Sequence, residues 1–188
     1  MDRAAVFVDA GYLFASGSKL VANERLPRRQ LQLNHERIIA TLHELTAALS
    51  GLPLLRIYWY DGATAAPTPQ QVAMAYCHNV KVRIGAMTPE GGQRGVDELL
   101  ISDLVALAQN KAIADALVLT GDEDLRPGVE QAQAFGVRVH LIGIAPRREN
   151  QASLLVQEAD TLHELQLADV QAFLTCVPAR SEAEKSQL

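Results

Sequence analysis

"DALVLTGDEDLRPGVEQAQAFGVRVHLIGI", residues 115–144, is the stretch that decides the expected fold. An apolar run leads to Gly121, a helical segment follows from Pro127 to Gly136, and a second apolar run completes the stretch. Strand, helix and strand in this order predict two parallel strands joined by a helix that packs on one face of their sheet. Three carboxylates, the "DED" of this stretch, follow the first strand directly. Their mutual repulsion needs a cation, a proton or a helix N-terminus to compensate it.

The same alternation of strands and helices extends along the rest of the chain. We expect further strands over residues 4–8, 53–62 and 80–87, further helices over residues 34–50, 69–79 and 97–110, and a short helix with a last edge element between residues 147 and 165. The sequence therefore predicts an α/β fold with a mostly parallel central sheet and helices on both faces. The length of 188 residues fits one domain, expected over residues 1–165, with residues 166–188 as a C-terminal helix and mobile tail.

The composition excludes several classes of protein. Hydrophobic residues make up 48% of the chain and charged residues 21%, which is a globular balance rather than a disordered one. A formal net charge of −5 argues against a protein that coats nucleic acid through bulk charge. No apolar run approaches the roughly 20 residues that span a bilayer, and the start "MDRAAVFVDAG" does not resemble a secretory signal. With two cysteines far apart in the sequence, we expect a cytoplasmic protein with no membrane partner.

Acidic residues follow several of the predicted strands. Because the carboxyl ends of parallel strands meet at one edge of a sheet, where ligands collect, we expect five acids to converge there: Asp9, Asp61, Asp97, Asp122 and Asp124. Taken singly, each is better explained as a turn residue or a helix N-cap than as a ligand. Their gathering on one edge favours a functional site, except for Asp61, for which the structural interpretation stays the favoured one. Within the turn that follows Gly121, we expect Asp122 and Asp124 to point the same way and Glu123 the opposite way.

Clustered carboxylates suggest a particular chemistry. Carboxylate oxygens suit Mg²⁺ or Mn²⁺, and a pair of such ions activates water and stabilises a leaving oxygen, which favours phosphodiester hydrolysis. The sequence lacks H-E-x-x-H, G-x-x-x-x-G-K-[ST] and G-x-S-x-G, and it has no G-x-G-x-x-G after the first strand. The arginines expected near the same edge, which would neutralise substrate phosphates, are Arg94, Arg126, Arg147 and Arg148, with a further basic segment at Arg25, Arg28 and Arg29.

Four segments occur in a recognisable order: "AVFVDAGYLF", "YWYDG", "QRGVDELLISDLVALA" and "LVLTGDEDLRPGVEQAQAFGVRVHLIG". Together they resemble the NYN domain family, the branch of PIN-like nucleases that includes the LabA-like proteins. The resemblance runs from about Ala4 to Leu165. It implies a PIN-like three-layer α/β/α sandwich and a ribonuclease that uses Mg²⁺ or Mn²⁺ and acts on RNA. Self-association into a homo-oligomer, frequent among PIN-like domains, is a further expectation.

The resemblance also implies roles for single residues. The family's catalytic and metal-binding acids fall on Asp9, Asp97, Asp122 and Asp124. Thr120 occupies the position of a small hydroxyl residue that assists substrate or water. Together with Arg94 and Arg126, it is a candidate for substrate binding.

Three other residues are expected to support the site or the fold rather than to act in it: Asp61, Asp103 and Tyr12. Asp103 matches a further family acid, but its spacing from Asp97 places it on another face of the helix. Tyr12 stands near the position of an asparagine in the family pattern D-G-x-N, where this chain reads "DAGY". This departure keeps open a second hypothesis, an RNA-binding or regulatory module that cleaves slowly or never. A phosphatase is less favoured, because such enzymes usually have D-x-D at the first strand.

Overall fold

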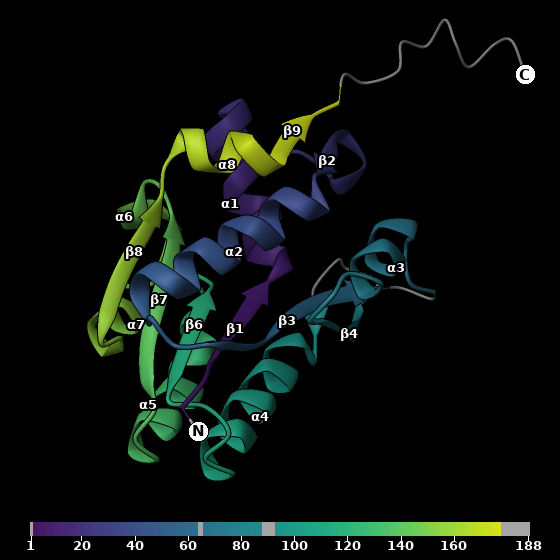
Figure 1. Cartoon of the computed structure of the whole chain (residues 1–188). Helices are drawn as coiled ribbons and strands as arrows, with labels where there is room; N and C mark the ends of the chain where they lie inside the picture. Colours follow the sequence, from purple (N-terminus) through teal and green to yellow (C-terminus); the bar gives the residue numbers. More distant parts are fainter. Residues whose placement is uncertain (1, 64–65, 88–92, 178–188) are drawn as a thin grey trace, which may run out of the picture.

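The computed structural model describes residues 2–63, 66–87 and 93–177. Within this part of the chain, seven strands form one sheet in the order β5-β4-β3-β1-β6-β7-β8 (Figure 1). They are β1 (Ala4–Asp9), β3 (Leu54–Ala63), β4 (Val80–Met87), β5 (Gln93–Arg94), β6 (Asp115–Leu119), β7 (Arg138–Ile144) and β8 (Thr161–Leu165). Neighbouring strands are parallel, except that β5 runs antiparallel to β4. The prediction of an α/β fold with a mostly parallel central sheet is confirmed.

Helices cover both faces of this sheet (Figure 1). One face packs against α1 (Ala10–Ala22), α2 (His35–Leu49), α3 (Pro69–Ala75) and α8 (Leu167–Phe173), and the other against α4 (Val96–Gln109), α5 (Arg126–Ala134) and α7 (Ser153–Glu158). Strand β1 supplies both cores: Val6 and Val8 point to the first face, and Ala5 and Phe7 to the second, since successive side chains of a strand alternate. Among the helices described, none has both the length and the apolar character needed to cross a membrane.

Helix α1 and a small second sheet were not predicted. Residues 16–18 of α1 read Ser-Gly-Ser, a combination of weak helix formers. Tertiary packing explains the helix, because a Cβ at Gly17 would lie 2.7 Å from Leu174 Cδ2. The missing side chain at Gly17 therefore leaves the space that Leu174 occupies against α1. Leu174 belongs to β9 (Leu174–Cys176), which pairs antiparallel with β2 (Leu31–Leu33).

The C-terminal segment extends past the domain end predicted at residue 165. Val170 and Phe173 of α8 are fully or almost fully buried in the same core as α1 and α2. Residues 178–188 of the predicted tail lie outside the described residues. The predicted boundary stays a prediction, although residues 167–176 pack against the body of the domain.

The arrangement of the central strands positions the candidate site. β1 lies between β3 and β6, and Val8 is paired with Leu119 in the parallel register. The next residues along these two strands are Asp9 and Thr120. They are therefore neighbours at the carboxyl edge of the sheet, where α1 begins and where the turn before α5 passes.

Candidate functional site

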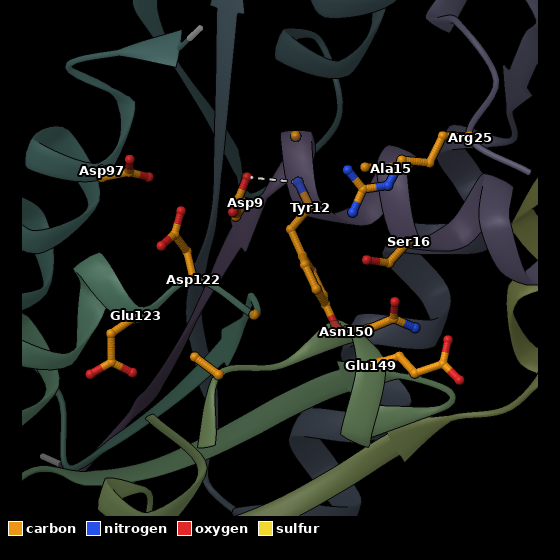
Figure 2. Close-up of a pocket in the computed structure, with 13 residues that line it drawn as sticks. Asp9, Tyr12, Ala15, Ser16, Arg25, Asp97, Asp122, Glu123, Glu149 and Asn150 are labelled. Carbon is orange, nitrogen blue, oxygen red and sulfur yellow. Dashed lines mark hydrogen bonds between the residues drawn. The ribbon is translucent and has the colours of Figure 1, made fainter. Parts of the chain in front are cut away.

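A cavity of about 560 Å³ opens at the carboxyl ends of β1 and β6. Asp9, Asp97 and Asp122 line it from three elements far apart in the sequence, and we call it the acidic cavity. Figure 2 shows these three carboxylates on one side of the cavity and Arg25 on the other, with the Arg25 guanidinium turned inward. The sheet edge therefore brings three of the five expected acids together.

Asp9 is held in place by hydrogen bonds to both carboxylate oxygens. It ends β1 and caps α1, where the Tyr12 backbone N–H donates to Oδ1 at 3.0 Å. The Thr120 hydroxyl donates to Oδ2 at 3.1 Å. Burial raises the pKa of Asp9, these hydrogen bonds lower it, and the nearby Asp122 carboxylate raises it again, with a net upward shift. The residue is thus rigid, and its negative charge is destabilised unless a cation is close.

Thr120 links Asp9 to Asp122. It is fully buried, and besides donating to Asp9 its hydroxyl oxygen accepts from the Asp122 backbone N–H at 3.2 Å. The Asp122 carboxylate in turn accepts from the Asp124 backbone N–H at 3.0 Å and so caps the short 3₁₀ helix η2 (Glu123–Leu125). Asp122 is therefore both a helix cap and a wall of the acidic cavity.

Asp97 enters the cavity from the first turn of α4. Gly95 precedes this helix with a φ of 81°, a backbone conformation that glycine adopts without strain, and the helix axis thereby begins at the carboxyl edge of the sheet. Burial, followed by repulsion from Asp9 and Asp122, raises the pKa of Asp97 to about 6. The shift comes mainly from burial, and repulsion from the neighbouring carboxylates adds to it.

Asp124 does not line the acidic cavity. It lines an adjoining cavity of about 390 Å³ together with Asp97 and Arg126. The expectation that Asp122 and Asp124 share a direction is wrong, because the segment forms a 3₁₀ helix rather than an extended turn, so alternate residues diverge. Glu123, expected to point away, lines both cavities.

Asp61 does not line the acidic cavity, so the expectation that it converges with the other acids is wrong. Its register neighbours explain this: Asp9 pairs with Tyr60, and Tyr60 points to the α4 face, so Asp61 points to the α1 face. There it is 2% exposed and accepts two hydrogen bonds from the Arg28 guanidinium, at 2.7 Å and 3.0 Å. Its contacts are structural.

Asp103 lies on another face of α4 from Asp97 and accepts from the Tyr60 hydroxyl at 3.0 Å. The Arg83 guanidinium donates to both of its oxygens, with Arg83 Nε at 2.8 Å from Oδ2. These bonds tie α4 to β3 and β4. Asp103 therefore stabilises the layer that carries Asp97.

The wall opposite the carboxylates contains Tyr12, which the sequence singled out, and Asn150, which it did not. Asn150 ends α6 (Arg147–Asn150), lines the acidic cavity and donates to the Ile144 and Ala145 carbonyls at 3.1 Å and 3.0 Å. Tyr12 stands beside it, and its hydroxyl accepts from the Ile144 backbone N–H at 3.0 Å. The segment around Asn150 carries no motif, so the sequence holds no signal for its place in this wall.

Close packing fixes this wall against the turn after β6. A Cβ on Gly121 would lie 2.0 Å from the Asn150 carbonyl oxygen and 2.4 Å from Tyr12 Cε2. Gln151, next to Asn150, donates to the Thr120 carbonyl at 2.8 Å. Burial raises the pKa of Tyr12 to about 12, so its phenol remains protonated at physiological pH.

The basic residues expected near this edge differ in where the structure places them. Arg126 lines the adjoining cavity and is paired with Glu123, at 2.7 Å, and with Glu130. Arg94 lies in β5, but its side chain is outside the part of the chain that the structure describes. Arg25, from the basic segment, is the arginine that lines the acidic cavity.

The donor chemistry of the acidic cavity fits a hard divalent cation, because its three aspartates offer oxygen ligands and repel one another without one. In the described residues, no three His, Cys, Asp or Glu side chains already stand close enough to hold a single ion. Rotation of the Asp97 or Asp122 side chain is the adjustment that binding would require, since Asp9 is fixed by its hydrogen bonds.

Comparisons with known proteins agree with this fold. The NYN domain model matches residues 3–166. The chain is 47% identical over 105 residues to y4oD, an uncharacterized protein of Sinorhizobium fredii, with 56% of this chain and 49% of that protein covered. It thus spans about half the length of the curated relative that it matches. A solved structure of VPA0982 from Vibrio parahaemolyticus, a protein of unknown function, has a TM-score of 0.60 at 15% identity and covers 93% of this chain and 96% of its own. That likeness shows the fold alone.

Proposed function

Because the chain belongs to the NYN domain family, whose fold is nuclease-like, we propose that it is a divalent-metal-dependent ribonuclease that hydrolyses RNA phosphodiester bonds at the acidic cavity. One observation carries the proposal. Asp9, Asp97 and Asp122 come from β1, α4 and the turn after β6, and they line one cavity in which repulsion and burial raise the pKa of Asp97 to about 6. Aspartates that served only as helix caps would not need to meet in one cavity.

Asp9, Asp97 and Asp122 are the residues that would hold Mg²⁺ or Mn²⁺. Asp124 remains a candidate through the adjoining cavity, which it shares with Asp97. When bound, such an ion supplies an activated water and stabilises the charge on the leaving oxygen. Thr120 fixes the orientation of Asp9, and its hydroxyl also accepts from the Asp122 backbone N–H, which holds the turn that carries Asp122.

Two further acids of the cavity lining, Glu123 and Glu149, are paired with Arg126 and Lys19, whereas Tyr12 and Arg25 are the neutral and basic residues that bear on the proposed function. Tyr12 does not act as a base, because its raised pKa keeps it protonated and its hydroxyl oxygen accepts from the Ile144 N–H. Its role is to pack against the turn at Gly121. Arg25 is the cation that faces the carboxylates across the acidic cavity, and it is suited to bind a phosphate of the RNA.

A second candidate function is an RNA-binding or regulatory module that does not cleave. The observation that favours it is that no three acidic or other ligand side chains in the described residues are gathered closely enough for one ion. The presence of Tyr12 near the position of the family's asparagine points the same way. Such a module would retain RNA uncut in every metal.

Cleavage of labelled single-stranded and structured RNA in Mg²⁺, Mn²⁺ or EDTA tests the first function against the second. Asp9→Asn and Asp97→Asn should each lower metal-dependent cleavage by more than about 100-fold, the upper end of the loss usual for residues that only support metal ligands. Glu44→Gln, which removes an exposed carboxylate on α2, is the matched control and should cleave normally. Calorimetric titration with Mn²⁺ should give weaker binding in the two aspartate variants. Intact RNA in every metal, or full cleavage by both aspartate variants, would reject the ribonuclease.

A further inference from the structure

A second and larger cavity, of about 1110 Å³, adjoins the acidic cavity. The two share Gly11, Ala15 and Arg25 in their linings, so Arg25 stands at their junction. The second cavity lies between α1, the 3₁₀ helix η1 (Arg28–Gln30), β2 and the start of α3. We call it the arginine groove and define it by Phe14, Arg25, Arg29, Leu33, His35 and Gln70.

Two arginines of this groove are available to a ligand. The side chains of Arg25 and Arg29 are exposed, and neither forms an ion pair with any acid in the described residues. Arg28 differs from both, since it is paired with Asp61 and stacked 3.7 Å above the Phe14 ring. Arg28 therefore shapes the groove, while Arg25 and Arg29 present positive charge to whatever enters it.

The lining of the groove is otherwise apolar with a few polar groups. Phe14, Leu31 and Leu33 are buried side chains on its floor. His35 adds a polar edge, because its Nε2 is buried and has no hydrogen-bond partner among the described residues. Apolar surface with an unpaired polar atom matches a nucleobase, which has apolar faces and a polar rim.

The distribution of charge around the acidic cavity favours a role for the arginine groove in attracting a polyanion. The chain carries a net charge of −5, and five of its carboxylates, from Asp9, Asp97, Asp122, Glu123 and Glu149, line the acidic cavity and repel a phosphodiester. Three of its 17 basic residues are concentrated at positions 25–29, at the side of the acidic cavity where Arg25 faces the carboxylates. Among the described residues that line the acidic cavity, Arg25 is the basic one, so it attracts a polyanion from this side.

We propose that the arginine groove binds the backbone of a single-stranded nucleic acid next to the phosphate that lies in the acidic cavity. Arg25 contacts the phosphate at the junction and Arg29 a phosphate further along, with a base against the floor of the groove. The groove volume of about 1110 Å³ lies slightly above the roughly 300–1,000 Å³ of small-molecule pockets, which leaves room for a base together with its sugar and phosphate. This inference rests on the proposed function, because the same phosphodiester chain is the substrate of the acidic cavity.

Binding in EDTA tests the groove without cleavage. Fluorescence anisotropy of a labelled oligouridylate is measured over a series of salt concentrations with the full chain. For single strands, each phosphate contact contributes about 0.7 to the slope of log K against log salt. Arg25→Gln and Arg29→Gln should each reduce the slope by about 0.7, and the double variant by about 1.4, with unchanged melting temperatures. Lys111→Gln removes an exposed positive charge near the start of β6, at the opposite end of the sheet, and should leave the slope unchanged.

An oligothymidylate of the same length distinguishes the source of the backbone, since binding of both strands assigns the groove to the shared phosphodiester and binding of uridylate alone assigns it to RNA. Three results would each overturn the proposal that the groove binds a single strand. They are a wild-type salt slope in the double variant, no binding of either strand by the wild type, and stronger binding of a duplex than of a single strand. The two proposals fail separately. Arginine-dependent binding without cleavage in any metal would remove the ribonuclease and keep the groove. Metal-dependent cleavage together with unchanged salt slopes in the arginine variants would keep the ribonuclease and remove the groove.

Discussion

Replacing Thr120 by valine should destabilise the protein through Asp9. Thr120 is fully buried, donates to Asp9 Oδ2 at 3.1 Å and accepts from the Asp122 N–H at 3.2 Å. Valine has nearly the same shape but no hydroxyl. Thr120→Val therefore removes two hydrogen bonds at once, with little change in packing.

The loss of stability in Thr120→Val can be worked out from the two groups that lose their hydrogen bond, the Asp9 carboxylate and the Asp122 N–H. A hydrogen bond to a charged group contributes about 1.5–3 kcal/mol, and an unpaired buried N–H costs about 1–3 kcal/mol. The Asp122 N–H is only partly buried, so water replaces part of its bond, and the added methyl group returns about 0.8 kcal/mol. We expect a net loss of about 2–3 kcal/mol in the free energy of unfolding at pH 8.

The loss should depend on pH. The Thr120 hydrogen bond lowers the pKa of Asp9, so its removal raises that folded-state pKa still further above the unfolded value. A raised carboxyl pKa gives stability that is full below the unfolded pKa and is lost as the pH rises through the folded pKa. Thr120→Val should therefore cost most above the folded pKa of Asp9 and progressively less in acid, where Asp9 is protonated.

Urea denaturation of the metal-free protein, from pH 4 to pH 8 with a constant denaturant slope, measures this. Thr120→Ser is the control, because it keeps the hydroxyl and loses one buried methyl group, at a cost of about 1 kcal/mol that should not vary with pH. The reasoning is refuted if the cost of Thr120→Val is the same across this range, or if valine and serine cost the same at pH 8.

Three further substitutions test other parts of the site. Burial and like charges raise the pKa of Asp97 to about 6, so its contribution to stability is full near pH 4 and is lost as the pH rises through about 6. The Asp97→Asn variant should thus be more stable than the wild type at pH 8, by about 1 kcal/mol after a discount for the partial exposure of this side chain. In urea titrations the difference should vanish near pH 4. Equal stability of the two proteins at pH 8 would contradict this prediction. Gly121→Ala should cost about 2–3 kcal/mol and lower the melting temperature, because its Cβ would stand 2.0 Å from the Asn150 carbonyl oxygen, so an unchanged melting temperature speaks against that contact. Asp61→Asn should cost about 2–3 kcal/mol in urea, less than a fully buried pair, because the Arg28 side chain is 37% exposed, and this variant should leave the metal dependence of cleavage intact; loss of that dependence would place Asp61 in the site after all.

The amino-acid sequence alone was enough to predict the fold and the approximate position of the site. Strand and helix periodicities are local properties, and β1, with its unbroken run of buried residues, is recognisable from six residues. Because parallel strands share a carboxyl edge, the sequence also indicated that Asp9 and Asp122 lie near one another, with Asp97 joining them at the start of its helix. Each of these conclusions needs only chain order and a period of two or 3.6 residues.

Only the tertiary structure decided which way individual side chains point and which partners they meet. Asp9 ends β1 and Asp61 lies near the end of the neighbouring strand β3, yet a difference of one residue in register sends Asp61 to the opposite face and to Arg28. Asp124 leaves the acidic cavity because its turn tightens into a 3₁₀ helix. Arg25 faces the carboxylates from more than 70 positions away from Asp97 in the chain. Contacts of that kind depend on how distant elements pack, which no local pattern encodes.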